Sequence, residues 1–177
     1  MQRINVEIKA RTYHPEEVHE LLAAQQAEFI GTDRQTDTYY KVPKGRLKLR
    51  QGNIEKALIH YFRDNEAGPK RSDVSLYKTG KQAGDLHEVL CSALDTLAIV
   101  VKRRSIYFIE NVKFHIDEVE GLGSFIEIEA IDKTGKIGEE KLRQQCQYYL
   151  NLFKVQPKDL IEVSYSDMVI AGAEANA

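Results

Sequence analysis

The chain lacks several features that mark common classes of protein. It has two cysteines, four prolines and no tryptophan in 177 residues. Cys91 and Cys146 have no CxxC spacing, which favours small buried thiols over a redox pair or a cysteine metal site. There is no GxxxxGK[ST] loop, and Gly121-x-Gly123 is not followed by the helix of a dinucleotide-binding turn. Any phosphate binding would therefore have to rely on side chains.

A strong excess of one charge and a long apolar run are also absent. The chain has 27 acidic and 25 basic residues, a net charge of −2, so no general attraction to nucleic acid or anionic lipid is expected. The longest apolar stretches, such as 97–101, are far shorter than the roughly 20 residues of a membrane span. No signal-peptide pattern opens the chain. These absences predict a cytoplasmic protein without a nucleic-acid or membrane partner.

The order of strands and helices predicts an α+β fold. The length and the lack of a composition break predict a single domain over residues 1–170, with a frayed tail of small residues over 171–177. Alternation of period two predicts strands near 4–9, 46–51, 57–63, 72–77, 98–107, 113–119 and 125–131, with residues 39–51 forming a hairpin and 64–71 a loop. Helical spacing predicts helices over 15–27, 86–97 and 138–153. Because several strands follow one another without a helix between them, antiparallel pairing is expected.

Charged residues alternate with apolar ones on several of these strands. Side chains two residues apart share one face of a strand. Glu127 and Glu129 therefore present two carboxylates to one side, which suits a hard cation that is also bound by waters and substrate phosphates. Asp117 could join them from the preceding strand, and Glu7 from the first strand if the sheet closes on itself. Basic residues alternate in the same way at Arg46, Lys48 and Arg50 and again at Lys102 and Arg104.

Two interpretations of this pattern are open. An ordinary antiparallel sheet with one solvated face gives the same alternation. Charged alternation on at least five predicted strands, together with three amphipathic helices that need an apolar surface, favours a closed barrel with a charged interior and helices outside. Because buried charges cost several kcal/mol unless they are paired, hydrated or bound to metal, such an interior would be built for a ligand.

Several motifs in order resemble the CYTH superfamily of triphosphate tunnel metalloenzymes. They are Asn5–Lys9, Gly45–Arg50, Lys102–Tyr107 and Asp117–Glu129, and the ending Ser164–Met168 resembles the class IV adenylyl cyclase and thiamine triphosphatase branch. The resemblance covers nearly the whole chain. It implies a closed eight-stranded antiparallel tunnel that binds a triphosphate with basic residues and Mg²⁺ or Mn²⁺ with glutamates. It also suggests a homodimer.

The resemblance assigns roles to individual residues. Glu7, Glu127 and Glu129 resemble the metal ligands, with Asp117 as a further acid. The expected phosphate-binding residues are Lys9, Lys48, Arg50, Arg63, Lys70, Arg71, Lys102 and Arg104, of which Lys9, Arg50 and Arg104 are also expected to be catalytic. The usual Glu-x-Glu-x-Lys motif begins here with Asn5, a neutral oxygen ligand that would bind a metal less tightly.

Three functions are compatible with these residues. The first is conversion of ATP to cyclic AMP and pyrophosphate, as in class IV adenylyl cyclases. The second is hydrolysis of thiamine triphosphate, inorganic triphosphate or a nucleotide. The third is a module that binds a polyphosphate or nucleotide without turning it over, a hypothesis that Asn5 keeps open. The first two use the same acids and bases and differ mainly in how the organic end of the substrate is placed.

Overall fold

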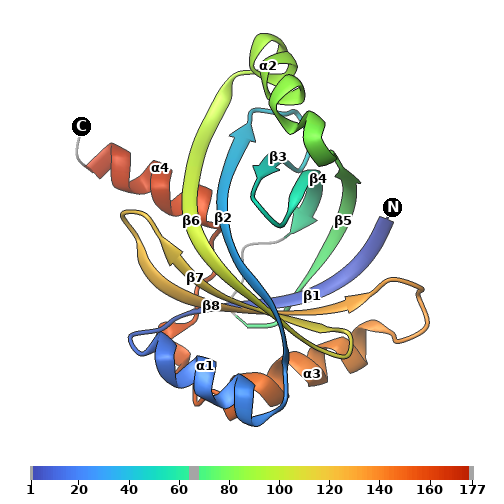
Figure 1. The fold of residues 1–177 in the computed structure, drawn as a ribbon, viewed down its shortest axis with the longest axis vertical. Helices are drawn as coiled ribbons and strands as arrows, with labels where there is room; N and C mark the ends of the chain where they lie inside the picture. Colours follow the sequence, from blue (N-terminus) through green and yellow to red (C-terminus); the bar gives the residue numbers. More distant parts are fainter. Residues whose placement is uncertain (1, 64–67, 176–177) are drawn as a thin grey trace.

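A computed structural model describes residues 2–63 and 68–175 of the chain. Over these residues it contains eight strands, four α-helices and two short 3-10 helices (Figure 1). The strands are β1 (Gln2–Arg11), β2 (Glu28–Tyr40), β3 (Arg46–Gln51), β4 (Lys56–Arg63), β5 (Lys70–Lys78), β6 (Thr96–Ile109), β7 (Val112–Val119) and β8 (Gly123–Asp132). The helices are α1 (Pro15–Ala24), α2 (Ala83–Ala93), α3 (Glu139–Leu152) and α4 (Tyr165–Ala175), with η1 (Gly80–Gln82) and η2 (Pro157–Asp159).

The strands form a closed ring in which each strand pairs with two neighbours. The order is β1-β5-β4-β3-β2-β6-β7-β8, and β8 pairs with β1 to close the ring. All of the pairs are antiparallel. The predicted α+β class and the eight antiparallel strands are therefore confirmed within the described residues.

Two helices cover the outer face of β1, β7 and β8, as Figure 1 shows below the ring. Helix α3 buries Leu142, Cys146 and Leu150, which lie four residues apart and so form one stripe of the helix. They pack on outward-facing apolar residues of the three strands, such as Ile8 and Phe114. Because the apolar residues of these strands are used outside, the alternate residues must face the interior of the ring.

The sequence predicted some boundaries wrongly. Helix α2 ends at Ala93 and β6 already begins at Thr96, whereas the helical spacing extended to residue 97. Residues 70 and 71 belong to β5 rather than to the predicted loop, and residues 64–67 of that loop lie outside the described residues. Helix α4 runs as far as Ala175, and residues 176–177 of the expected frayed tail lie outside the described residues. Cys146 is buried, but Cys91 is exposed on α2, so the expectation of two buried thiols is half wrong.

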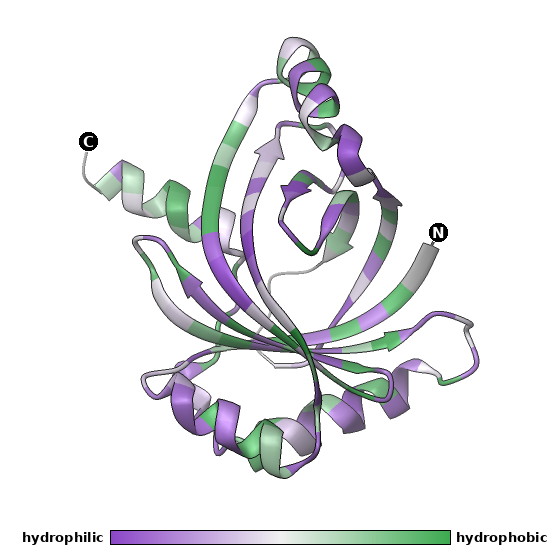
Figure 2. Ribbon diagram, in the orientation of Figure 1, coloured by the Kyte–Doolittle hydropathy of each residue, from purple (hydrophilic) through white to green (hydrophobic). Residues whose placement is uncertain are grey.

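Hydropathy changes along a single strand of the ring. Figure 2 shows β6 as hydrophobic near α2 and hydrophilic further along, where residues 102–104 lie. Helix α2 lies at the end of the ring opposite to α1 and α3 (Figure 1). Among the described residues, no helix has both the length and the apolar character needed to cross a membrane.

Candidate functional site

A cavity of about 510 Å³ lies inside the ring, and all eight strands contribute to its lining. Its described lining includes six buried or half-buried basic side chains: Lys9, Lys48, Arg50, Lys102, Arg104 and Lys113. Four glutamates also line it: Glu7, Glu55, Glu127 and Glu129. Three exposed lysines, Lys56, Lys78 and Lys81, which we call the lysine rim, complete the charged lining. Acids and bases from distant parts of the chain therefore meet in one cavity.

Strand register explains why these side chains meet. Glu7 of β1 lies directly opposite Glu129 of β8, and Lys9 lies opposite Glu127. On the other side of β8, Lys113 of β7 lies opposite Glu129. Directly paired residues point to the same face of a sheet, with Cβ atoms about 5 Å apart. The charged residues that alternate with apolar ones in the sequence therefore share one face of β1, β8 and β7, where they form a single charged wall.

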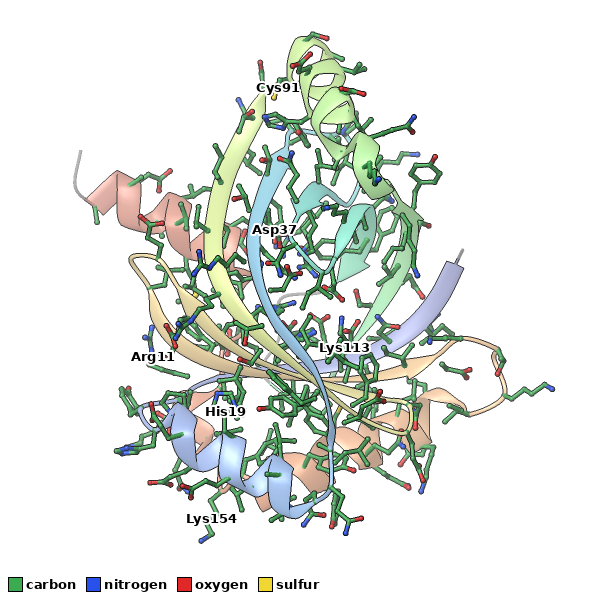
Figure 3. All side chains as sticks on the ribbon, in the orientation of Figure 1. Arg11, His19, Asp37, Cys91, Lys113 and Lys154 are labelled. Atoms are coloured by element: carbon green, nitrogen blue, oxygen red, sulfur yellow. The ribbon has the colours of Figure 1, made fainter. Side chains whose placement is uncertain are left out.

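Asp37 of β2 is a buried centre of charge pairing beside the cavity. Its carboxylate accepts hydrogen bonds from Lys102 Nζ at 2.7 Å, from Arg50 Nε and Nη2 at 2.9 Å each, and from Lys48 Nζ at 3.1 Å. Burial acts to raise the pKa of Asp37, but Arg50, Lys102 and Lys48 outweigh it and hold that pKa well below its usual value. Figure 3 shows the labelled side chain of Asp37 in the interior of the ring. Three of the basic residues are therefore held in place by one ionised carboxylate.

Arg104 is fixed by a second buried carboxylate. Its Nε and Nη2 donate to the two oxygens of Asp117 at 2.6 Å each, and Nη2 also donates to Glu127 at 2.9 Å. Tyr165, at the start of α4, donates its hydroxyl to Asp117 at 2.8 Å. Asp117 is fully buried and is not part of the cavity lining, because Arg104 and Tyr165 use its oxygens. In this structure Asp117 is a partner of Arg104 and Tyr165, and its expected role as a metal ligand stays a prediction.

His115 and Glu127 form a buried pair in the cavity wall. The Nδ1 atom of His115 lies 3.3 Å from Glu127 Oε2, while Nε2 has no hydrogen-bond partner among the described residues. Burial, with Arg104 and Lys113 nearby, lowers the pKa of His115 to about 3. The imidazole is therefore neutral at pH 7. If Nδ1 carries the proton and donates to Glu127, Nε2 is an acceptor among cations.

Lys102 is the basic residue of the cavity whose charge depends on pH near neutrality. Burial lowers its pKa to about 7, with Arg50, Arg104 and Lys48 acting in the same direction against Asp37. An additional anion in the cavity would favour the charged ammonium. Lys102 is therefore a group that would take up a proton when an anionic ligand binds.

The oxygens of Glu7, Glu129 and Asn5 fit a hard divalent cation. Glu7 and Glu129 both line the cavity and lie opposite each other. The Asn5 amide nitrogen donates to Glu129, and its buried carbonyl oxygen Oδ1 has no hydrogen-bond partner among the described residues. Within the described residues, no three histidine, cysteine, aspartate or glutamate side chains converge to hold an ion. Mg²⁺ often uses one or two carboxylates and completes its shell with phosphate oxygens and waters, so this donor set suits it.

Two of the expected phosphate-binding residues do not line the cavity, and a third has a side chain outside the described residues. Lys70 is buried, but its ammonium donates to the carbonyls of Ile161 and Glu162, at 3.3 and 2.7 Å. Arg71 is exposed on the opposite face of β5, where it pairs with Asp73 and Glu139. Because Lys70 and Arg71 are adjacent residues of strand β5, their side chains point to opposite faces of the sheet. The side chain of Arg63 lies outside the described residues.

The sequence analysis missed several residues of the site. Asp37 and Asp33 lie on β2, where both faces are polar, so no apolar alternation marked the strand. Asp33 accepts hydrogen bonds from the backbone nitrogens of Ile54 and Glu55, both at 2.8 Å, and so holds the β3–β4 loop. Glu55 then reaches Arg50 at 2.8 Å and also binds Lys113. Lys113 could have been found, since it alternates with apolar residues on β7.

Comparisons with known proteins agree with this architecture. A family model of the CYTH domain matches residues 3–165. No curated protein sequence matches the chain. The PH1012 protein of Pyrococcus horikoshii has a solved structure with a TM-score of 0.77 and 20% identity, over 93% of this chain and 99% of that one.

Two further solved structures share the fold. One is a candidate adenylate cyclase from Vibrio parahaemolyticus, with a TM-score of 0.75 and 16% identity over 95% of this chain and 98% of that one. The other is a candidate adenylyl cyclase from Hippeastrum with a dominant triphosphatase activity, with a TM-score of 0.63 and 14% identity over 96% of each chain. Since the family model spans most of the sequence, the chain belongs to the CYTH domain family.

Proposed function

We propose that the protein is a divalent-metal-dependent enzyme that binds a triphosphate in the cavity and cleaves it as an adenylyl cyclase does, giving cyclic AMP and pyrophosphate from ATP. The observation that carries the proposal is the convergence of six basic side chains from β1, β3, β6 and β7 on one cavity. A triphosphate carries several negative charges close together, and clustered Lys and Arg side chains are the groups that match them.

In this proposal, Lys9, Arg50 and Arg104 bind the phosphates and stabilise the charge that develops during the reaction. Arg50 and Arg104 have buried partners that fix the orientation of the guanidinium groups before a ligand enters. Donors that are already oriented need no rearrangement when charge develops on the phosphate oxygens. Lys48, Lys102 and Lys113 add charge along the same cavity.

Glu7 and Glu129, with Asn5 Oδ1 as a neutral ligand and Glu127 nearby, would hold the metal. When bound, Mg²⁺ or Mn²⁺ polarises phosphate oxygens and lowers the pKa of an attacking hydroxyl. The Asn5 amide donates a hydrogen bond to the Glu129 carboxylate, which would help to orient that carboxylate for binding the metal. An amide at this position also avoids placing a further carboxylate beside Glu129.

Hydrolysis of a triphosphate is the alternative reaction, in which water replaces the 3′-hydroxyl of ATP as the attacking group. The structurally similar Hippeastrum protein, with its dominant triphosphatase activity, supports this alternative. Thiamine triphosphate and inorganic triphosphate are then further candidate substrates. A binding module without turnover is the third candidate, supported by Asn5 in place of the family glutamate.

A product assay separates these functions. The protein is incubated with ATP and Mn²⁺, and cyclic AMP, pyrophosphate and orthophosphate are quantified by chromatography. Cyclic AMP with equimolar pyrophosphate supports the cyclase, whereas orthophosphate without a cyclic nucleotide would replace it with the hydrolase. If the protein turns over none of ATP, thiamine triphosphate and inorganic triphosphate, the binding module is the candidate function that remains.

Adjacent arginines of β6 provide a matched pair of variants for this assay. Arg104 faces the cavity, whereas Arg103 is exposed and pairs with Glu118 outside the ring. Arg104→Gln should lower turnover by at least 100-fold, the magnitude typical of losing a charge-stabilising donor. Arg103→Gln should leave turnover within about twofold, because a surface ion pair contributes little. Equal activity of the two variants would contradict the proposed site.

A further inference from the structure

The wall of the cavity is chemically uneven. Five interior-facing residues of β4 and β5, between the polar Ser72 and Lys78 that also line the cavity, are apolar: Ala57, Ile59, Tyr61 and Val74 form a buried cluster, with Leu76 packed against it. All five line the same cavity as the basic residues, and we call them the apolar wall. This cluster is separate from the two apolar clusters that include residues of α1, α3 and α4. It is therefore not an extension of the core under the helices.

Register makes the apolar wall continuous and places it beside the basic residues. Ile59 pairs directly with Leu76, and Tyr61 pairs with Val74. On the other edge of β4, Ile59 pairs with Lys48 and Ala57 pairs with Arg50. Since directly paired residues have Cβ atoms about 5 Å apart, the apolar wall begins one strand away from the phosphate-binding residues.

Aromatic rings mark the boundary between the two halves of the cavity. Lys48 Nζ lies 5.3 Å from the centroid of the Tyr39 ring and 5.9 Å from that of Tyr61. Both rings belong to residues that line the cavity. Aromatic rings stack on other planar groups at centroid separations of about 4.5–7 Å. A planar group attached to a phosphate chain near Lys48 would therefore meet aromatic and aliphatic surface next.

Apolar surface along an open cavity gains free energy only when a ligand or the protein covers it. Inorganic triphosphate has no apolar surface and would leave the cavity-facing part of this wall uncovered. A nucleoside triphosphate offers a charged end for the basic residues and a planar end for the apolar wall. The two halves of the cavity therefore match the two halves of an organic triphosphate.

Charge at the edge of the apolar wall narrows the class of organic group. Ala57 pairs with Lys78, which belongs to the lysine rim with Lys56 and Lys81. Three ammonium groups beside the apolar wall disfavour a cationic group such as the thiazolium of thiamine. A neutral heterocycle does not meet this repulsion.

From these observations we propose that the apolar wall of β4 and β5 is a subsite for the neutral heterocyclic base of a nucleoside triphosphate. The proposal rests on the proposed function, since it takes the basic half of the cavity as the phosphate site. It makes a nucleoside triphosphate a better ligand than inorganic triphosphate or thiamine triphosphate.

Calorimetric titration with EDTA present tests this subsite without metal-dependent turnover. ATP, thiamine triphosphate and inorganic triphosphate are titrated into the wild-type protein and into Leu76→Ala. Leu76 is only partly buried, so the variant should fold, and its melting temperature is measured beside that of the wild type. Phe62→Ala is the matched control, because Phe62 lies on the outer face of β4 and is half exposed.

The expected result is that ATP binds the wild type at least tenfold more tightly than inorganic triphosphate and more tightly than thiamine triphosphate. Leu76→Ala should weaken the affinity for ATP at least fivefold and leave the affinity for inorganic triphosphate within about twofold, while Phe62→Ala changes neither affinity. Equal affinity for ATP and inorganic triphosphate, or equal loss of both in Leu76→Ala, would overturn the subsite alone. Tighter binding of thiamine triphosphate than of ATP would overturn the neutral base. Failure of all three ligands to bind, both with EDTA and with Mn²⁺ in its place, would overturn the proposed function as well.

Discussion

Replacing Asp37 with asparagine removes a buried negative charge that three basic side chains share. Lys48, Arg50 and Lys102 all donate to its carboxylate at 2.7–3.1 Å, and Asp37 itself is fully buried. Asparagine keeps the shape of the side chain but leaves these cations without their common partner. Removing one member of a buried ion pair costs about 3–5 kcal/mol. For a chain of this size, that corresponds to a fall of roughly 10 °C in melting temperature.

The size of this effect should depend on pH. Burial holds the pKa of Lys102 at about 7 with Asp37 present, and the loss of Asp37 should lower it further. At pH 6 the wild-type ammonium is charged and paired, so the variant loses that pairing in full. At pH 8.5 Lys102 is mostly neutral in both proteins, and the destabilisation should be smaller.

Ligand binding makes this variant a test of function as well as of stability. If the cavity binds a triphosphate, the phosphates replace the missing carboxylate, and saturating inorganic triphosphate should raise the melting temperature of Asp37→Asn more than that of the wild type. Asp73→Asn is the control, because Asp73 pairs with Arg71 on the outer face of β5. Its melting temperature should change by less than about 2 °C. Equal ligand-induced shifts in Asp37→Asn and the wild type would refute the reasoning.

Three further predictions follow from buried groups of the cavity. Triphosphate binding at pH 8 should be accompanied by proton uptake at Lys102, because added anions raise its pKa from about 7; calorimetry in buffers of different ionisation enthalpy measures this, and buffer-independent heats would contradict it. Asn5→Glu should lower the melting temperature in EDTA through repulsion from Glu129 and regain it with Mn²⁺; no difference between the two conditions would count against a metal site there. The native pKa of His115, about 3, lies below its unfolded value near 6.5, so its contribution to stability is present above pH 6.5 and is lost as pH falls toward 3, at about 1.4 kcal/mol per pH unit. Urea unfolding at pH 7, 6 and 5 should therefore show a shallower decline for His115→Gln, and parallel declines would contradict the assignment.

Much of the ring could be predicted because its charges alternate with apolar residues. On β1 and β8, apolar side chains face the helices and charged ones face inward, so the period of two identified both the strands and the face. Most of β2 was missed because residues 32–38 are polar on both faces; only its end, residues 39–40, was expected, as one arm of the hairpin with β3. Helix α2 was predicted too long because Leu97, on the outer face of β6, happens to continue the helical spacing.

Position along the inside of the ring could not be predicted from the sequence. The two-residue alternation along β7 placed Asp117 on the inner face correctly, but the packing of Tyr165 and Arg104 around it removes it from the cavity lining. The alternation of side chains also puts Lys70 and Arg71 on opposite faces of β5. The sequence analysis assigned both residues to a loop and therefore did not predict this. These outcomes depend on contacts between residues 13 to 92 positions apart, which periodicity does not encode.

The most direct test of the whole account is a crystal structure of the protein grown with inorganic triphosphate and Mn²⁺. The account predicts phosphate density inside the ring, within hydrogen-bond distance of Lys9, Arg50 and Arg104, and a metal peak between Glu7 and Glu129. Ordered triphosphate bound only to the outer face, with the ion pairs of the interior unchanged, would contradict it.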